Sequence, residues 1–331
     1  MPAITTYTKP LTTDQVARLK SVLQDGCYTF EAKPYCLYAA TKNKLNVLVY
    51  EKGPKVLVQG KETEDFVTNV LEPLILGVAE LGYEEVHHPE MYEPHIGVDE
   101  SGKGDFFGPL VIAGVYVDAN VARKLRELGV VDSKKISSDA KISQLAAAIR
   151  SVAGLRWEVV QINPTKYNEL YSKFGNLNRL LAWGHATSIE SLVEKVPDCP
   201  RALSDQFANP TVLQRALRAK GCQIELIQRT KAESDPAVAA ASILARDAFV
   251  KWLDQNGSRF EIELPKGVSN VVKENARKIY DKAGRPGLAT VAKMHFKTAS
   301  EVCGDFPPTN FDASDGFSSK EVLADSKDTG I

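Results

Sequence analysis

Hydrophobic and polar positions follow helical spacing in some segments and strict alternation in others. Near the start of the chain, a helical pattern is followed by two alternating segments around Lys52-Gly53-Pro54, which is typical of a hairpin turn. A second helical pattern comes next, so residues 1–81 predict a small α+β domain. The predicted elements are helices over 12–23 and 63–79 and strands over 44–50 and 55–59.

The rest of the chain has three sections of different pattern. Residues 82–94 are rich in Glu, His and Pro without periodicity and predict a linker. Short apolar runs and helical patterns then predict an α/β domain over 95–303. Residues 304–331 contain few apolar side chains and predict a disordered acidic tail. The predicted strands are 95–99, 110–117, 155–162, 202–205 and 223–228, and the predicted helices are 139–152, 178–195, 211–219 and 236–253.

Composition narrows the class of protein. With 331 residues and 44% hydrophobic side chains, the chain can bury the cores of two domains. No apolar run approaches the roughly twenty residues that a membrane helix requires. The five cysteines are scattered without metal-binding spacing and no secretory leader is evident, so we expect a cytoplasmic protein. The net charge is only -1, but residues 1–61 hold nine Lys and Arg against four Asp and Glu.

Residues 95–110 carry the strongest chemical signal. An apolar strand-like run ends in Asp99 and Glu100, and Lys103 follows between Gly102 and Gly104. Glycines leave backbone amides open beside the ammonium, which suits a phosphate backbone. The glycine spacing matches neither a dinucleotide-binding site nor a P-loop. The alternative from this motif alone is an ordinary turn with two solvated acids.

Further carboxylates follow later predicted strands. Asp205 ends one strand, and Glu233 and Asp235 lie between another strand and a helix. Acids at strand ends can converge, and such a cluster repels itself unless hard cations such as Mg²⁺ or Mn²⁺ neutralise it. Two such ions would suit phosphodiester cleavage. Taken singly, Asp205 or Glu233 is as well explained as a surface acid or a helix cap.

Several motifs together resemble the type 2 ribonucleases H, and ribonuclease HIII among them. The Gly-Lys-Gly triplet is similar to ribonuclease HIII, whereas ribonuclease HII carries Gly-Arg-Gly. The resemblance spans nearly the whole chain. Its motifs are GVDESGKGD at 97–105, DSKK at 132–135, GNLN at 175–178 with LAWGHA at 181–186, SDQF at 204–207, and KAES at 231–234 with the small residues of 237–245.

The resemblance implies a ribonuclease H-like mixed-sheet catalytic domain preceded by a TATA-binding-protein-like substrate-binding domain. It implies Mg²⁺- or Mn²⁺-dependent endonucleolytic cutting of the RNA strand in RNA/DNA hybrids, with 3′-hydroxyl and 5′-phosphate ends. Asp99, Glu100 and Asp205 would be metal-binding catalytic acids. The fourth acid would be Glu233, which holds the motif position, and Asp235 is its rival because many relatives have Asp as the fourth acid.

Glu100 poses a geometric problem, because consecutive strand residues face opposite sides of a sheet. A bulge, or the end of the strand at Glu100, would resolve it. By the same resemblance, Gly102, Lys103 and Gly104 would bind the RNA backbone and its 2′-hydroxyls. Plain tight-turn geometry would also explain the two glycines.

Three other features admit two interpretations. Ser133 and Lys134 resemble a backbone-contacting turn, but spacing alone favours a solvated loop. His185 lies among apolar helical residues, which predicts a packed structural histidine. His295 could stack on substrate or pack in the core.

The N-terminal lysines predict a nucleic-acid contact. Lys44, Lys55 and Lys61 lie on or beside the predicted hairpin, where a basic sheet face can follow phosphates. The plain alternative is a solvated face.

We expect a monomer that acts on a hybrid and contacts no membrane. Two functional alternatives stay open, namely ribonuclease HII-like cleavage at single ribonucleotides in DNA, and a non-catalytic hybrid-binding protein.

Overall fold

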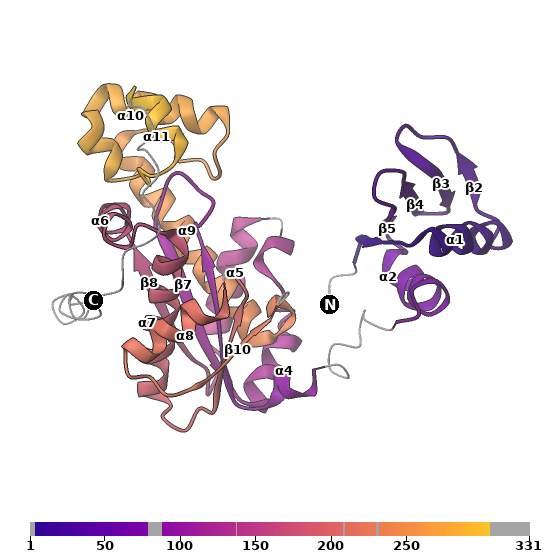
Figure 1. Ribbon diagram of the computed structural model, residues 1–331, viewed down its shortest axis with the longest axis horizontal. Coiled ribbons are helices and arrows are strands. Elements are labelled where there is room, and N and C mark those ends of the chain that lie inside the picture. Colours follow the sequence, from indigo (N-terminus) through magenta and orange to yellow (C-terminus); the bar gives the residue numbers. More distant parts are fainter. Residues whose placement is uncertain (1–3, 79–87, 137, 208, 230–231, 305–331) are drawn as a thin grey trace. The chain divides into compact units, whose positions relative to one another are not determined.

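A computed structural model describes residues 4–78, 88–136, 138–207, 209–229 and 232–304. The chain divides into two compact units, Met1–Glu90 and Met91–Ile331 (Figure 1). The predicted tail lies outside the described residues from 305 onward, as do residues 82–87 of the predicted linker. The rest of that linker includes a short 3₁₀ helix, η2 (Pro89–Tyr92).

The N-terminal unit is an antiparallel sheet with helices on one face. Its strand order is β1-β5-β4-β3-β2. Alternate residues of the central strands, such as Val47 and Val58, are buried in one cluster with Leu19 and Leu23 of the first helix. The elements are β1 (Thr6–Pro10), α1 (Thr13–Asp25), β2 (Thr29–Glu31), β3 (Cys36–Lys42), β4 (Leu45–Tyr50), β5 (Lys55–Gly60), α2 (Thr63–Phe66) and the π-helix η1 (Val67–Leu76).

The sequence pattern found the central hairpin and both helices of this unit but missed three strands. β1 and β2 are short edge strands rich in polar residues, and β3 buries three consecutive residues, so its pattern does not alternate. Pro73 interrupts the helix predicted over 63–79, because proline has no N–H to donate. The backbone there takes the wider π-helical form and ends at Gly77, which has a left-handed conformation.

The C-terminal unit is built on a mixed sheet of order β10-β9-β6-β7-β8. β6 pairs in parallel with β9 and antiparallel with β7. The strands are β6 (His95–Ser101), β7 (Leu110–Val117), β8 (Arg156–Ile162), β9 (Arg201–Asp205) and β10 (Glu225–Arg229). The helices are α4 (Ala119–Glu127), η3 (Ser133–Lys135), α5 (Asp139–Arg150), α6 (Pro164–Phe174), α7 (Leu177–Lys195), α8 (Pro210–Ala219), η4 (Ala232–Ser234), α9 (Pro236–Phe260), α10 (Asn270–Ala289) and α11 (Lys297–Cys303).

All five strands and four of the helices in this unit agree with the sequence pattern to within a few residues, except that α9 extends beyond the predicted end. The pattern missed α4, α6, α10 and α11. These helices are largely polar, and α10 contains Gly284 and Pro286, which break its periodicity. None of the helices in the described ranges has the length and apolar character needed to cross a membrane.

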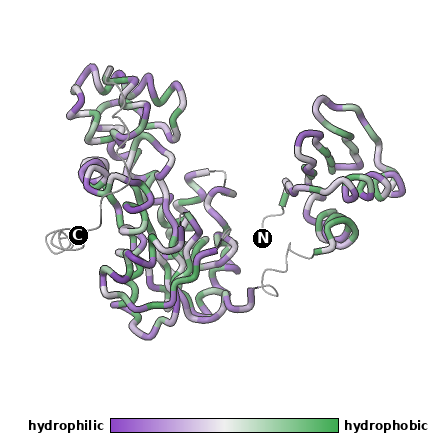
Figure 2. Tube along the Cα trace, viewed as in Figure 1, coloured by the Kyte–Doolittle hydropathy of each residue, from purple (hydrophilic) through white to green (hydrophobic). Residues whose placement is uncertain are grey.

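Helices cover both faces of this sheet. α9 packs on β6 and β7, and α7 packs on the opposite face of the same strands (Figure 1). Apolar residues accordingly concentrate along the central strands (Figure 2). A Cβ at Gly97 would lie 2.5 Å from the carbonyl carbon of Ala237, whereas a Cβ at Gly114 would meet Ser188 and Leu192 of α7. The two glycines therefore mark where each helix approaches the sheet most closely.

The close approach of α9 to β6 makes Gly97 a strong test of this architecture. In Gly97→Ala the new methyl would overlap the backbone of Ala237 and Val238, which a side-chain rotation cannot relieve. We expect the free energy of unfolding to fall by about 3 kcal/mol, the upper end of the range for an overpacked core. Urea denaturation measures this. Gly104→Ala is the control, because a Cβ there would meet nothing within 4 Å. Equal stability of the two variants would contradict this account of the packing.

Candidate active site

Two acids lie next to each other at the carboxyl edge of the sheet. Val98 of β6 pairs with Ser204 of β9 in parallel register, so the following residues, Asp99 and Asp205, occupy equivalent positions on neighbouring strands. Residues in parallel register point to the same face. By strand alternation this face is the one where Gly97 meets α9. The fold therefore brings together two of the acids that the sequence singled out.

Glu100 lies on the other face of β6. Its Oε2 accepts a hydrogen bond from Nε2 of His185 on α7 at 3.1 Å, and its Oε1 lies 3.4 Å from the Lys103 ammonium. The strand continues in unbroken register to Ser101 opposite Val111. The expectation of a bulge, or of a strand that ends at Glu100, was therefore wrong. Glu100 and Asp99 point to opposite faces, and the sheet edge is where the two can share a site.

His185 links Glu100 to the neighbouring strand. The ring is buried, and its Nδ1 lies 3.3 Å from Oγ of Ser204, which donates to the carbonyl of Asp205. The predicted structural histidine is thus packed, but it also contacts a candidate acid. The helical pattern alone could not show this partner. A buried imidazole requires polar partners, and that requirement was the only available signal.

The two adjacent acids have different electrostatic environments. Burial raises the pKa of Asp99 well above its ordinary value, and the nearby charge of Glu100 adds to the rise. Burial also opposes ionisation of Glu100, but hydrogen bonds and charges from His185 and Lys103 lower its pKa to about 2. Glu100 is therefore a fixed anion, while Asp99 needs additional positive charge to ionise.

Lys134 supplies part of that positive charge. It belongs to the turn η3, which is fixed by a hydrogen bond from the Ser133 amide to Ser242 of α9 and by Arg246, which donates to the carbonyl of Ser133. Burial opposes its charge, but nearby carboxylates raise the pKa of Lys134; they belong to Asp99, Asp132, Glu233 and Glu100. The turn predicted at 132–135 therefore lies beside the acids and is not a solvated loop.

Glu233 and Asp235 have different surroundings. Asp235 is buried and caps α9, because its Oδ1 accepts from the amides of Ala237 at 2.8 Å and Val238 at 3.4 Å. The same oxygen lies 2.9 Å from Nε2 of His95. Glu233 lies on η4, is partly exposed, and contributes to the negative field around Lys134. Asp235 is therefore buried with one carboxylate oxygen engaged in contacts that hold the fold, whereas Glu233 is partly exposed and can meet a ligand.

The glycines of the Gly-Lys-Gly loop differ in their structural roles. Gly102 has a φ of +86°, and a Cβ there would meet the carbonyl of Pro109 and the ring of Phe249. Gly104 has neither constraint. Tight-turn geometry thus explains Gly102 but not Gly104, which leaves open space beside the half-exposed Lys103.

A buried lysine holds the far side of this loop. The ammonium of Lys293 donates to the carbonyls of Asp105 at 2.9 Å, Gly108 at 2.7 Å and Phe107 at 3.4 Å. Burial lowers its pKa to about 7, and the three carbonyls match the three protons of the charged form. The residue two positions on, His295, stacks on a tyrosine of α6 with ring centroids 4.1 Å apart, which is core packing.

The acids fit a divalent cation by their chemistry. Their oxygens are the donors that Mg²⁺ and Mn²⁺ prefer, and Lys134 is a protein cation drawn to the same field. Within the described ranges, however, no three His, Cys, Asp or Glu side chains form a group that could hold an ion as they stand. Coordination of one ion by acids from both faces therefore requires their side chains to turn toward the sheet edge.

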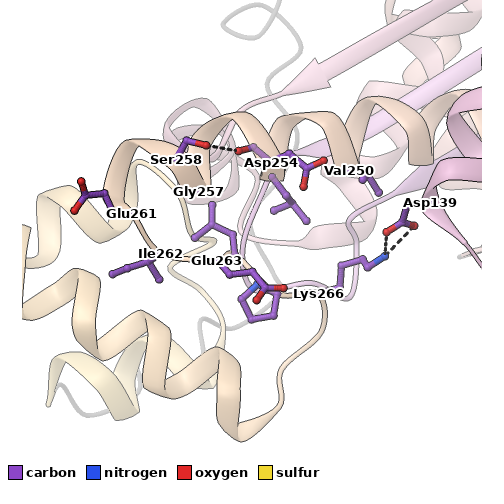
Figure 3. A pocket seen from close by; sticks show the side chains of 12 residues that line it. Asp139, Val250, Asp254, Gly257, Ser258, Glu261, Ile262, Glu263 and Lys266 are labelled. Atoms are coloured by element: carbon purple, nitrogen blue, oxygen red, sulfur yellow. Dashed lines mark hydrogen bonds and ion pairs between the residues drawn. The ribbon is translucent and has the colours of Figure 1, made fainter.

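A separate cavity of about 700 Å³ lies along the C-terminal half of α9 and the segment after it (Figure 3). None of the candidate acids lines it. Lys266 on its wall pairs with Asp139, which also pairs with Arg246, the residue that holds the η3 turn. The cavity is therefore separate from the acid cluster. Its wall contributes only indirectly, through Asp139 and Arg246, to holding the η3 turn.

The N-terminal lysines lie at two ends of their sheet. Leu45 pairs with Gly60, so Lys44 and Lys61 flank one end, whereas Lys55 pairs with Tyr50 at the other. All three lysines are exposed. Because Val56 and Val58 face the helices, Lys55 lies on the open face.

Comparisons with known proteins agree with this architecture. The model of the family described as Ribonuclease HII matches residues 96–299. The chain is 45% identical to Ribonuclease HIII of Protochlamydia amoebophila over 86% of this chain and 92% of that protein, and 43% identical to Ribonuclease HIII of Chlamydia pneumoniae over 88% and 96%. It also resembles the crystal structure of Bst-RNase HIII in complex with Mn²⁺, with a TM-score of 0.62 and 27% identity over 90% of this chain and 98% of that one.

The mixed sheet with acid-ended parallel strands is the fold of the ribonuclease H class. A second structure, Aquifex aeolicus RNase H3, matches with a TM-score of 0.51 and 28% identity over 88% of this chain and all of that one. The chain belongs to the ribonuclease HIII family. The family and fold class predicted from the motifs are thereby confirmed.

The contact between His185 and Glu100 generates a stability prediction. Because the pKa of Glu100 is about 2 in the folded protein and 4.5 as the ordinary value, its ionised form stabilises the fold above pH 4.5, and this contribution is lost as the pH falls toward 2. In His185→Leu we expect the free energy of unfolding at pH 7 to fall by about 3 kcal/mol, because a buried carboxylate loses its partner.

Urea denaturation at pH 7 and pH 3 measures the effect, and the difference from the wild type should shrink at pH 3. Ser188→Ala is the control, since its buried hydroxyl, one turn further along α7, makes no hydrogen bond within the described residues. A difference that is independent of pH would show that His185 acts by packing alone.

Proposed function

We propose that the chain is an endonuclease that hydrolyses the RNA strand of RNA/DNA hybrids and leaves 3′-hydroxyl and 5′-phosphate ends. The observation that carries the proposal is the parallel pairing of β6 and β9, which sets Asp99 beside Asp205 next to the Gly-Lys-Gly loop. Membership in the ribonuclease HIII family supports the same activity. A cytoplasmic location and a monomeric state stay predictions from the sequence.

The four acids would hold Mg²⁺ or Mn²⁺. They are Asp99, Glu100, Asp205 and Glu233. Ions bound there would activate water for attack on the phosphodiester and neutralise charge on the leaving oxygen, as in two-metal sites generally. Mn²⁺ in the related Bst-RNase HIII crystal supports a divalent ion. Glu233 is preferred over Asp235 because the Asp235 carboxylate already accepts hydrogen bonds from His95 and the start of α9.

Protein groups around the acids would bind and orient the substrate. The Lys103 side chain is 38% exposed and could contact a phosphate while still near Glu100. The open space at Gly104 would let the ribose come close to the backbone amides, and the 2′-hydroxyl distinguishes RNA from DNA. Ser133 and Lys134, held by α9 on the other side of the acids, would contact a further part of the backbone.

The N-terminal unit would bind the hybrid through its basic lysines. Lys44 and Lys61 at one end of the sheet and Lys55 at the other could contact phosphates that are separated along the duplex. The open face between them carries a row with the partly exposed Leu48 and Leu57 and a polar row beside it. One row across four neighbouring strands consists of Thr6, Gln59, Asn46 and Thr41. Exposed lysines beside a row of polar side chains suit a sugar-phosphate backbone.

Cleavage of a labelled hybrid tests the activity directly. The wild type should cut a substrate with several consecutive ribonucleotides when Mg²⁺ or Mn²⁺ is added, and not in excess EDTA. Asp99→Asn should lower kcat at least about a thousandfold, equivalent to about 4 kcal/mol, with hybrid affinity retained. Binding without cleavage by the wild type would instead indicate a hybrid-binding protein. Preferred cutting at a single ribonucleotide in DNA would favour ribonuclease HII-like specificity.

Removal of residues 1–80 tests the N-terminal unit. We expect hybrid affinity to fall at least about tenfold, because the lysines release counterions on binding, while the single-turnover cleavage rate at saturating enzyme stays near that of the full chain. The affinity of the full chain should also depend more steeply on salt. Lys44→Gln combined with Lys61→Gln provides a gentler variant with the unit intact. Unchanged affinity in both proteins would remove the substrate-binding role of this unit.

A further inference from the structure

A buried pair of ionisable residues joins the first residue of β6 to the N-terminus of α9. Nε2 of His95 lies 2.9 Å from Oδ1 of Asp235, and the two side chains are 2% and 3% exposed. The residues are 140 positions apart in the sequence. In the sequence, Asp235 is the rival of Glu233 for the fourth acid, and His95 opens the strand that ends in the acidic motif.

Both nitrogens of the His95 ring have polar partners. Nδ1 of His95 lies 2.7 Å from the carbonyl oxygen of Glu93, which can only accept a hydrogen bond. The Asp235 oxygen accepts from the Ala237 and Val238 amides as a carboxylate does. Each ring nitrogen therefore has a polar partner, and these contacts hold the imidazole between the segment before β6 and the start of α9. Burying two ionisable side chains costs free energy, because both lose their hydration. The hydrogen bond between them, once formed, restricts their relative orientation.

The pair lies on the strand face that carries Asp99. Side chains alternate along β6, so His95, Gly97 and Asp99 share one face. On this face His95 holds the α9 cap, Gly97 allows the α9 backbone to come close, and Asp99 ends the row at the acid cluster. Glu233 lies two residues before the cap, on η4, whose Ala232 carbonyl accepts from the Asp235 amide at 2.9 Å.

We propose that the buried contact between His95 and Asp235 positions the fourth acid of the site. The contact fixes the start of α9 to β6. Because η4 directly precedes α9, the contact thereby sets the distance between the carboxylates of Glu233 and Asp99. This inference rests on the proposed function, because it takes Glu233 to be a metal ligand. His95 and Asp235 themselves touch neither metal nor substrate.

The chain contains a matched control for the capping role of Asp235. Asp118 caps α4 in the same way, with Oδ1 accepting from the amides of Asn120 and Val121, both at 2.9 Å. No histidine partner for Asp118 occurs among the described contacts, and it lies at the far end of β7 from the acids. Asparagine caps helices about as well as aspartate, so Asp235→Asn and Asp118→Asn both keep the cap. Only Asp235→Asn replaces a carboxylate that contacts a buried histidine.

Mn²⁺ binding in the absence of substrate tests the inference without relying on activity. Free Mn²⁺ is measured by electron paramagnetic resonance on the full chain at a temperature where every variant is folded by circular dichroism. We expect Glu233→Gln to weaken Mn²⁺ affinity most. Asp235→Asn and His95→Gln should each weaken it about tenfold, the lower end of the range for outer-sphere positioning groups, and Asp118→Asn should leave it unchanged. In cleavage assays the ranking should be the same in kcat, with KM for the hybrid unaltered.

The double variant gives a second, independent measurement. If the two residues act only through their contact, His95→Gln with Asp235→Asn should weaken Mn²⁺ affinity no more than either change alone. Multiplied effects, or an Asp235→Asn affinity equal to that of Asp118→Asn, would overturn the positioning role. A Glu233→Gln affinity equal to wild type, with Asp235→Asn strongly impaired, would also overturn it and make Asp235 the ligand. Failure of the wild type to cut hybrids would overturn the proposed activity, while the Mn²⁺ comparison still decides the pair.

Discussion

The parallel pairing of β6 with β9 is the constraint on which the site depends. Parallel strands end at the same edge of a sheet, so the pairing of Val98 with Ser204 brings Asp99 and Asp205 together although more than a hundred residues separate them. With antiparallel pairing, the acid that ends β9 would lie at the opposite end of β6. The antiparallel β7 on the other side of β6 then returns the chain through the loop that carries Lys103. The acids, Lys103 and the accessible backbone around Gly104 therefore lie at the same edge of the sheet.

The acids concentrate negative charge at this edge of the sheet. Basic side chains from three different parts of the chain lie beside them. His185 comes from α7, Lys103 from the loop after β6, and Lys134 from the η3 turn. None of these is a neighbour of the others in sequence. Each partner approaches from a different side, and together they hold Glu100 as an anion, while the raised pKa of Asp99 means that it needs further positive charge to ionise. A metal would then compete with protein cations for the same oxygens, which favours reversible binding.

Much of this organisation is visible in the sequence. The apolar runs ending in Asp99 and Asp205 predicted both strands, and the alternation rule correctly exposed the problem of placing Asp99 and Glu100 in one site. The bulge offered as its solution was wrong, because alternation gives facing directions but not how a strand continues. The sequence offered Glu233 as a possible cap of the following helix, but the structure shows that Asp235, directly before Pro236, is the cap. Its contact with His95 was not foreseeable, because pairing across 140 residues depends on tertiary packing.

The Lys293 contacts have a consequence for how the chain matures. Its ammonium closes on the carbonyls of Asp105 and Gly108, up to 188 residues earlier in the sequence. Chains emerge from the ribosome N-terminus first, and domains fold as units once their parts are available. The strands that bear the acids are thus synthesised long before the lysine that shapes the adjoining loop. A chain that ended before residue 293 would carry every acid of the proposed site but would lack the contacts that fix the adjoining loop.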